Sequence, residues 1–239
     1  MPTSDSSAEF IQSLKDGLLR LGRTVELSIS RSIRALKHRD KPLARGVIEG
    51  DKKIDQAEVE LEKLCVHILE THQPTGADLR FVVSVLKIND ALERIGDLSE
   101  NIAQSVLHGA RWEGFDEVKG YEQLSELAQM MLQRSLEAFV DQDVRVAHRV
   151  IHDDDKIDAL RKHMGRAIET AVDNNQGLGS ALLRLEFVSR QLERIADYAT
   201  NIAEDVIYMI DGKIVRHPSR FRDPNNVISD ESGTFRRVK

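Results

Sequence analysis

The chain has 239 residues, of which 41% are hydrophobic and only 5% aromatic, and its formal net charge is −6. An acidic balance argues against nucleic acid as the main partner, because phosphate backbones attract basic surfaces. The single cysteine, Cys65, excludes an internal disulfide. We find no export signal and no apolar run of membrane-spanning length, so we expect a cytoplasmic protein that is at most peripheral to a membrane.

The predicted elements are all helices. An aliphatic composition with few prolines favours helices over strands. Apolar residues recur at helical spacing through six segments, and turn formers such as Pro42 and Gly76 lie between them. The expected helices span residues 8–39, 43–72, 78–108, 116–141, 143–174 and 179–210. We therefore predict an all-α fold with three helices on each side of the connection between Gly109 and Gly120.

Two phrases of the sequence occur twice. ALERIGDLSENIAQSV at 91–106 and QLERIADYATNIAEDV at 191–206 match at nine of sixteen positions. DKKID at 51–55 and DDKID at 154–158 match at four of five positions. The offset is 100 residues for the longer phrase and 103 for the shorter one, so a three-residue length change lies between them. Self-similarity of this kind is the signature of a repeated structural unit. The sequence therefore predicts a duplicated three-helix bundle.

This duplication gives the expected domain organisation. The first unit spans residues 8–109 and the second spans residues 116–211. A C-terminal extension, residues 212–239, carries seven lysines and arginines against three acids and shows no helical periodicity. Polar, aperiodic segments with prolines bury too little apolar surface to pack, so we expect a flexible basic tail.

The third helix of each unit shows how it packs. Its apolar residues step alternately by four and three positions, which is typical of the buried seam of a helical bundle. The seam residues are Phe81, Val85, Ile88, Leu92, Ile95, Ser99, Ile102 and Val106 in the first unit, and Ala181, Leu185, Val188, Leu192, Ile195, Ala199, Ile202 and Val206 in the second. On a helical wheel Glu93 and Asp97 lie together, away from this seam.

Pairs of acids four residues apart recur in the repeated phrases. Chance alone gives roughly seven such pairs in a chain this acidic, so one pair means little. The repeats, however, contain the spacing four times, in Asp51 with Asp55, Glu93 with Asp97, Asp154 with Asp158, and Glu193 with Asp197. Each unit then supplies one pair from its second helix and one from its third, and an antiparallel arrangement brings them face to face.

Carboxylates that converge in this way repel one another unless a cation compensates them. Arg94 and Arg194 supply only one positive charge to each group of four acids. Carboxylate ligands suit iron, zinc, manganese or magnesium, so the spacing favours a metal ion in each unit. The alternative is an unliganded, solvated acidic face.

An enzyme is the second alternative, because carboxylate-bridged metal-dependent hydrolases and oxidases also use helical bundles. Their recurring element is Glu-x-x-His on two helices with ligands that point into the core. No glutamate of this chain is followed by histidine at the third position. We therefore expect no catalytic residues and no organic cofactor.

The repeated LERI-[GA]-D-x-x-x-NIA phrase, with the D-x-x-x-D phrase of the preceding helix, closely resembles the PhoU family of bacterial phosphate-specific transport. The resemblance covers about residues 8 to 215. It implies two related three-helix bundles and two metal sites. One site would be built from Asp51, Asp55, Glu93 and Asp97, and the other from Asp154, Asp158, Glu193 and Asp197.

The resemblance also implies a function. It is that of a negative regulator of the phosphate-starvation response, which couples a phosphate ABC transporter, through its ATPase subunit, to a sensor histidine kinase. We further expect a homodimer and no nucleic-acid partner.

Overall fold

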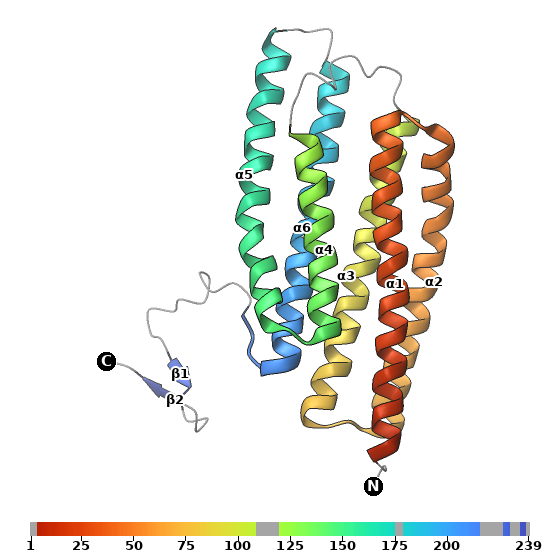
Figure 1. Cartoon of the computed structure of the whole chain (residues 1–239), viewed down its shortest axis with the longest axis vertical. Coiled ribbons are helices and arrows are strands. Elements are labelled where there is room, and N and C mark those ends of the chain that lie inside the picture. The colour runs from red at the N-terminus through yellow and green to blue at the C-terminus, as the bar shows by residue number, and fades with distance from the viewer. Residues whose placement is uncertain (1–3, 109–119, 175–178, 216–226, 230–234, 238–239) are drawn as a thin grey trace.

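The structure is a computed structural model that describes residues 4–108, 120–174, 179–215, 227–229 and 235–237. Six helices dominate it (Figure 1). They are α1 Ser4–His38, α2 Lys41–His72, α3 Gly76–Leu107, α4 Tyr121–Asp141, α5 Val144–Asn174 and α6 Gly179–Asp211. Two short antiparallel strands, β1 Val227–Ser229 and β2 Phe235–Arg237, follow in the C-terminal segment. The predicted all-α body with six helices is confirmed.

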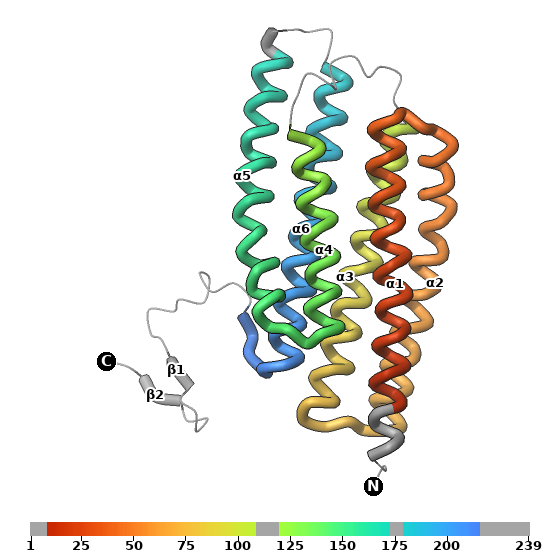
Figure 2. The backbone as a smooth tube through the Cα atoms, in the orientation of Figure 1, coloured from red at the N-terminus to blue at the C-terminus, as the bar shows by residue number. Residues whose placement is uncertain are grey.

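The helices form two three-helix bundles that lie side by side. Helices α1, α2 and α3 pack on one another, as do α4, α5 and α6, and the two bundles meet mainly along α3 and α6. The tube view shows that α3 and α6 run in opposite directions (Figure 2). The second bundle is therefore inverted relative to the first.

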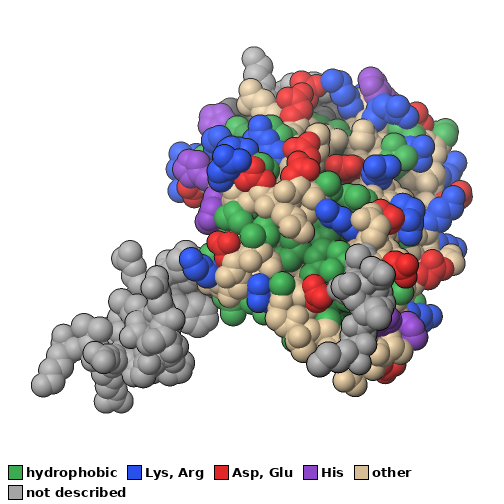
Figure 3. Space-filling model, turned by 60° about the horizontal axis from the view of Figure 1, so that its bottom comes forward, with side chains coloured by type: hydrophobic (Ala, Val, Ile, Leu, Met, Phe, Trp, Pro, Cys, Tyr) green, Lys and Arg blue, Asp and Glu red, His purple; other side chains and the backbone are tan. Residues whose placement is uncertain are grey.

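The core follows the predicted seams. Every seam residue named from the sequence in α3 and α6 is buried, including the small Ser99 and Ala199. The buried residues of both bundles form one continuous apolar cluster, to which α1 contributes Leu14, Leu18 and Leu21. The surface mixes acidic, basic and apolar side chains on the face shown in Figure 3. No helix among the described residues is long and apolar enough to cross a membrane.

Local chemistry explains where the helices begin and end. The Asp40 side chain accepts a hydrogen bond from the Leu43 backbone N–H at 2.9 Å and caps α2, with Pro42 in the first turn. Helix α2 therefore begins two residues before the predicted start. Helix α4 begins at Tyr121 after Gly120, whose φ of 111° suits glycine. The predicted earlier start, residues 116–119, lies outside the described residues.

Polar contacts join the two bundles along α3 and α6. The Lys87 ammonium pairs with the carboxylate of Asp205, which is 3% exposed. The Ser84 hydroxyl donates to the Asp205 backbone carbonyl at 3.2 Å, and the Lys87 ammonium lies 5.6 Å from the centre of the Tyr208 ring. These contacts fix the register of the two bundles. Of the predicted basic tail, only residues 212–215 and the two strands belong to the described residues.

Candidate functional site

The first candidate site lies between α2 and α3 of the first bundle. Asp51 is 7% exposed, and its Oδ1 atom has no hydrogen-bond partner. Burial, together with four nearby carboxylates, raises the pKa of the Asp51 carboxyl to about 7; the four are those of Asp55, Glu100, Asp97 and Glu93. The structure thus places the four acids predicted from the sequence in one electrostatic group, which we call the first cluster. Glu100 is an additional member.

One arginine accompanies the first cluster. The Arg94 guanidinium lies 3.3 Å from Glu93 Oε2 and 3.6 Å from Asp97 Oδ2. It also lies 3.9 Å from Asp90, and its side chain is 49% exposed. Ion pairs this exposed stabilise a protein little, so Arg94 compensates the cluster only in part. Burial also raises the pKa of Glu93, and Asp97 raises it further.

A glycine lets α2 and α3 approach closely at the first cluster. A Cβ atom added at Gly96 would lie 3.0 Å from Cγ2 of Ile54 and 3.2 Å from Oδ1 of Asp51. The unpartnered Oδ1 of Asp51 is therefore directed toward α3. The helical wheel puts Glu93 and Asp97 away from the buried seam, but the expectation that the carboxylates face outward is wrong for Asp51, because this close approach buries it.

The second candidate site lies between α5 and α6. Burial, with the carboxylates of Asp154, Glu193 and Asp158, raises the pKa of the Asp197 carboxyl to about 6, and Arg194 opposes this rise. These four acids, which we call the second cluster, are the ones predicted from the sequence. Burial also raises the pKa of Asp154, and a hydrogen bond from the Thr200 hydroxyl to Asp154 Oδ1, at 3.2 Å, opposes that rise.

A second arginine reaches the second cluster. Arg161 of α5 is only 19% exposed, and its Nη2 lies 2.8 Å from Glu186 Oε1. Its Nε lies 3.0 Å from Glu193 Oε2, which is ion-pair distance, although the N–H does not point at that oxygen as a hydrogen bond requires. Glu193 is therefore compensated within the chain.

Sequence reasoning missed Glu100, Thr200 and Arg161. The signal for Glu100 was present, because it follows Glu93 and Asp97 at the same four-and-three spacing and so shares their face. Thr200 takes the equivalent place in the second unit, one hundred residues later. Comparison of the non-matching positions within the repeated phrases would have found both.

The carboxylates do not form a ready-made ion cage. Among the described residues, no three or more His, Cys, Asp or Glu side chains are arranged so that they could hold one metal ion as they stand. Mutual repulsion and the pairing of Glu93 and Asp97 with Arg94 account for the separation. An ion would have to draw the side chains together by rotamer changes. The first cluster suits such an ion, because it holds a buried and unpartnered carboxylate oxygen.

Two inverted three-helix bundles, joined along their third helices and each carrying a carboxylate cluster between its second and third helices, define a class of duplicated helical-bundle proteins. The comparisons specify this class further. The family described as "PhoU domain" matches residues 18–106 and 121–206. The chain belongs to the PhoU family.

Relatives support this assignment along most of the chain. The "Phosphate-specific transport system accessory protein PhoU" of Serratia marcescens is 32% identical over 207 residues, which are 87% of this chain and 85% of the relative. The crystal structure of PhoU from Pseudomonas aeruginosa is 33% identical, with a TM-score of 0.79 over 88% of this chain and 100% of that one. The "phosphate transport system regulatory protein PhoU" of Streptococcus pneumoniae, at 28% identity, has the same TM-score over 87% of this chain and 99% of that one. The predicted family and fold are confirmed.

Proposed function

We propose that this protein is a regulatory accessory protein of phosphate uptake. The observation that carries the proposal is the match along 87% of the chain to a relative named as an accessory protein of phosphate-specific transport. The likeness includes the fold as well as the sequence, because a structure titled as a phosphate transport regulatory protein superposes at a TM-score of 0.79.

Within this role, the protein works in the cytoplasm as a homodimer and contacts the ATPase subunit of a phosphate ABC transporter and a sensor histidine kinase. The long helices offer broad, rigid faces for such contacts. A relay of this kind needs a different affinity for each state of its partners, because a protein that binds both states equally shifts neither. Its effect is negative: it represses the starvation response when phosphate is plentiful.

A gene deletion tests the regulatory role. We expect starvation-response genes to stay active in high phosphate in the deletion strain, and the intact gene to restore repression. Normal repression in a deletion strain that has no second copy of the gene would refute the proposal. A pull-down with the tagged chain tests the partners, and recovery of neither transporter nor kinase components would remove them.

We also propose that each cluster binds a divalent metal ion. The ligands are Asp51, Asp55, Glu93 and Asp97 in the first cluster, and Asp154, Asp158, Glu193 and Asp197 in the second. The buried, unpartnered oxygen of Asp51 supports the first site. A bound ion would supply positive charge that offsets the repulsion among the carboxylates and so stabilises each bundle.

Elemental analysis of protein purified without chelator tests the metal sites. We expect metal in the protein, and a fall in melting temperature when a chelator removes it. No metal above background, with an unchanged melting temperature, would contradict the proposal.

No observation favours the alternative of a metal-dependent hydrolase or oxidase, and the absence of turnover stays a prediction. Reproducible phosphatase or oxidase activity that disappears in Glu93→Ala would make it wrong.

A further inference from the structure

We propose that the two clusters bind divalent metal ions with unequal strength, tightly in the first bundle and weakly in the second. The proposal rests on the metal binding proposed above and adds the residues that set the difference. Within the repeat, Arg161 of α5 stands where α2 has Glu58, and Thr200 of α6 stands where α3 has Glu100. The chain thus supplies part of the second site's compensation itself.

The first cluster carries the larger uncompensated charge. At equivalent positions it has six carboxylates against the guanidinium of Arg94, namely Asp51, Asp55, Glu58, Glu93, Asp97 and Glu100. Arg94 is exposed and lies at the edge of the group. Glu58 is connected to this group through Asp55, which helps to raise its pKa, and its Oε1 accepts a hydrogen bond from the Asn89 amide at 3.1 Å. A divalent ion is the compensation that this group lacks.

The second cluster has a smaller deficit. At the same positions it has four carboxylates, Asp154, Asp158, Glu193 and Asp197, against two guanidinium groups, those of Arg161 and Arg194. Two more acids, Asp155 and Glu186, act on this group, and Arg190 adds a third guanidinium through its contact with Glu186. The Arg161 guanidinium is held between Glu186 and Glu193 with contacts of 2.8 Å and 3.0 Å. An ion that binds Glu193 must break the ion pair between Glu193 and Arg161. The positive charge of Arg161 also repels the ion. Both effects weaken binding.

A hydrogen bond adds to the difference. The Thr200 hydroxyl donates to Asp154 Oδ1, so this oxygen has a partner that the equivalent Asp51 oxygen lacks. The second site therefore begins from a better satisfied state without an ion, and gains less from binding one.

Manganese titration of the full chain, stripped with a chelator, tests the inference. We expect calorimetry with Mn²⁺ alone to show two classes of site, whose affinities differ on the order of tenfold or more, because one nearby charge changes a binding energy by more than 1 kcal/mol. Asp97→Asn should remove the tight class. Asp197→Asn should remove the weak class.

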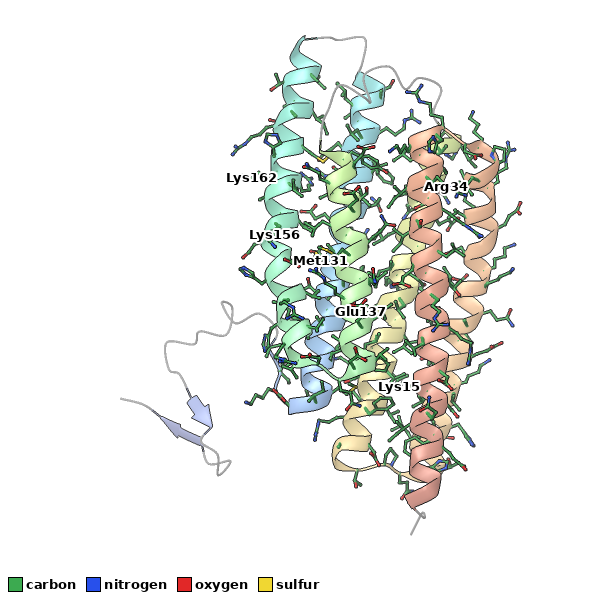
Figure 4. The ribbon with its side chains drawn as sticks, viewed as in Figure 1. Lys15, Arg34, Met131, Glu137, Lys156 and Lys162 are labelled. Carbon is green, nitrogen blue, oxygen red and sulfur yellow. The ribbon has the colours of Figure 1, made fainter. Side chains whose placement is uncertain are left out.

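Two variants act on the difference itself. Arg161→Gln and, independently, Thr200→Glu should each strengthen the weak class on the order of tenfold and leave the tight class unchanged. Glu100→Thr should weaken the tight class. The control is Lys162→Gln, which removes one positive charge from an exposed residue of the same helix (Figure 4) and should change neither class. If Arg161→Gln destabilises α5, Thr200→Glu still tests the inference.

The outcomes separate this inference from the proposed function. A single class of sites with equal affinity would overturn the inference and leave metal binding in place. So would a weak class that neither Arg161→Gln nor Thr200→Glu strengthens. Loss of the weak class in Asp97→Asn would also overturn it. No Mn²⁺ binding in the wild-type protein would remove the metal sites altogether, whereas the regulatory role is decided by the gene deletion.

Discussion

Lys87 of α3 and Asp205 of α6 form an ion pair across the interface between the two bundles. The lysine side chain is 37% exposed and the aspartate side chain only 4%. The buried carboxylate of Asp205 is therefore compensated by the ammonium of Lys87, which lies nearer the protein surface. Removal of the partner is costly, because the buried charge loses its compensation.

We expect Lys87→Met to lower the free energy of unfolding by about 1–3 kcal/mol, since Asp205 stays buried with less compensation. Denaturant titration measures the change. The double variant Lys87→Met with Asp205→Leu should recover most of the loss, because it removes both charges. Lys63→Met, at an exposed lysine of α2, serves as control. A change in Lys87→Met no larger than in Lys63→Met would show that the pair is unimportant for stability.

The groove between α1 and α4 gives a prediction about pH. Glu26 and Glu137 line it, together with Arg23, and Figure 4 labels Glu137 and the neighbouring Lys15, whose ammonium donates to the Val140 carbonyl at 2.9 Å. Burial raises the pKa of Glu26 above its ordinary value of 4.5; Glu137 raises it further, and Arg23 opposes the rise.

A raised folded-state pKa means that the folded protein holds this proton more tightly than the unfolded chain. The stabilisation is fully present below 4.5 and is lost as pH rises through the folded-state value. Glu26→Gln cannot ionise, so we expect it to gain about 0.5 kcal/mol over the wild type between about pH 4 and about pH 8. Unfolding curves at both pH values measure this. The exposed Glu70→Gln is the control, and an equal gain there would contradict the assignment.

The helices, the duplication and the seams could be predicted from the sequence because they depend on local periodicity. Leu92 and Ile195, for example, belong to apolar series at helical spacing, and such a series lies on the one face of a helix that packs into the core. The eight acids could be predicted because the repeats place them on matching faces. Arg161 could not, since its contact with Glu193 depends on the relative rotation of α5 and α6. The burial of Asp51 likewise depends on how closely α2 approaches Gly96.

Gly96 itself gives the third prediction. Alanine in a helix interior usually stabilises by roughly 0.5–1 kcal/mol relative to glycine. At Gly96, however, the added Cβ would lie 3.0 Å from Cγ2 of the buried Ile54, whose side chain would have to shift by a few tenths of an ångström. We therefore expect Gly96→Ala to lower the free energy of unfolding by about 1 kcal/mol. Gly46→Ala is the matched control, because a Cβ there meets nothing within 4 Å, and it should stabilise the protein. Stabilisation by both variants would show that α2 and α3 can separate without cost.

The last prediction concerns the conflict between stability and metal binding at Asp51. At about pH 8, above the pKa of about 7 that burial and the neighbouring carboxylates produce, Asp51 is charged, buried and surrounded by other carboxylates. Asp51→Asn keeps the shape of the side chain and removes this charge, so we expect it to stabilise the chelator-treated protein by about 1 kcal/mol. The same change should reduce the rise in melting temperature that Mn²⁺ produces, because an amide oxygen is a weaker ligand than a carboxylate. Asp55→Asn is the comparison: Asp55 is exposed, so the variant relieves only its repulsion with Asp51 and should stabilise the stripped protein less than Asp51→Asn does, while it also weakens the response to Mn²⁺. Destabilisation of the stripped protein by Asp51→Asn would mean that this carboxylate contributes to folding without a metal ion.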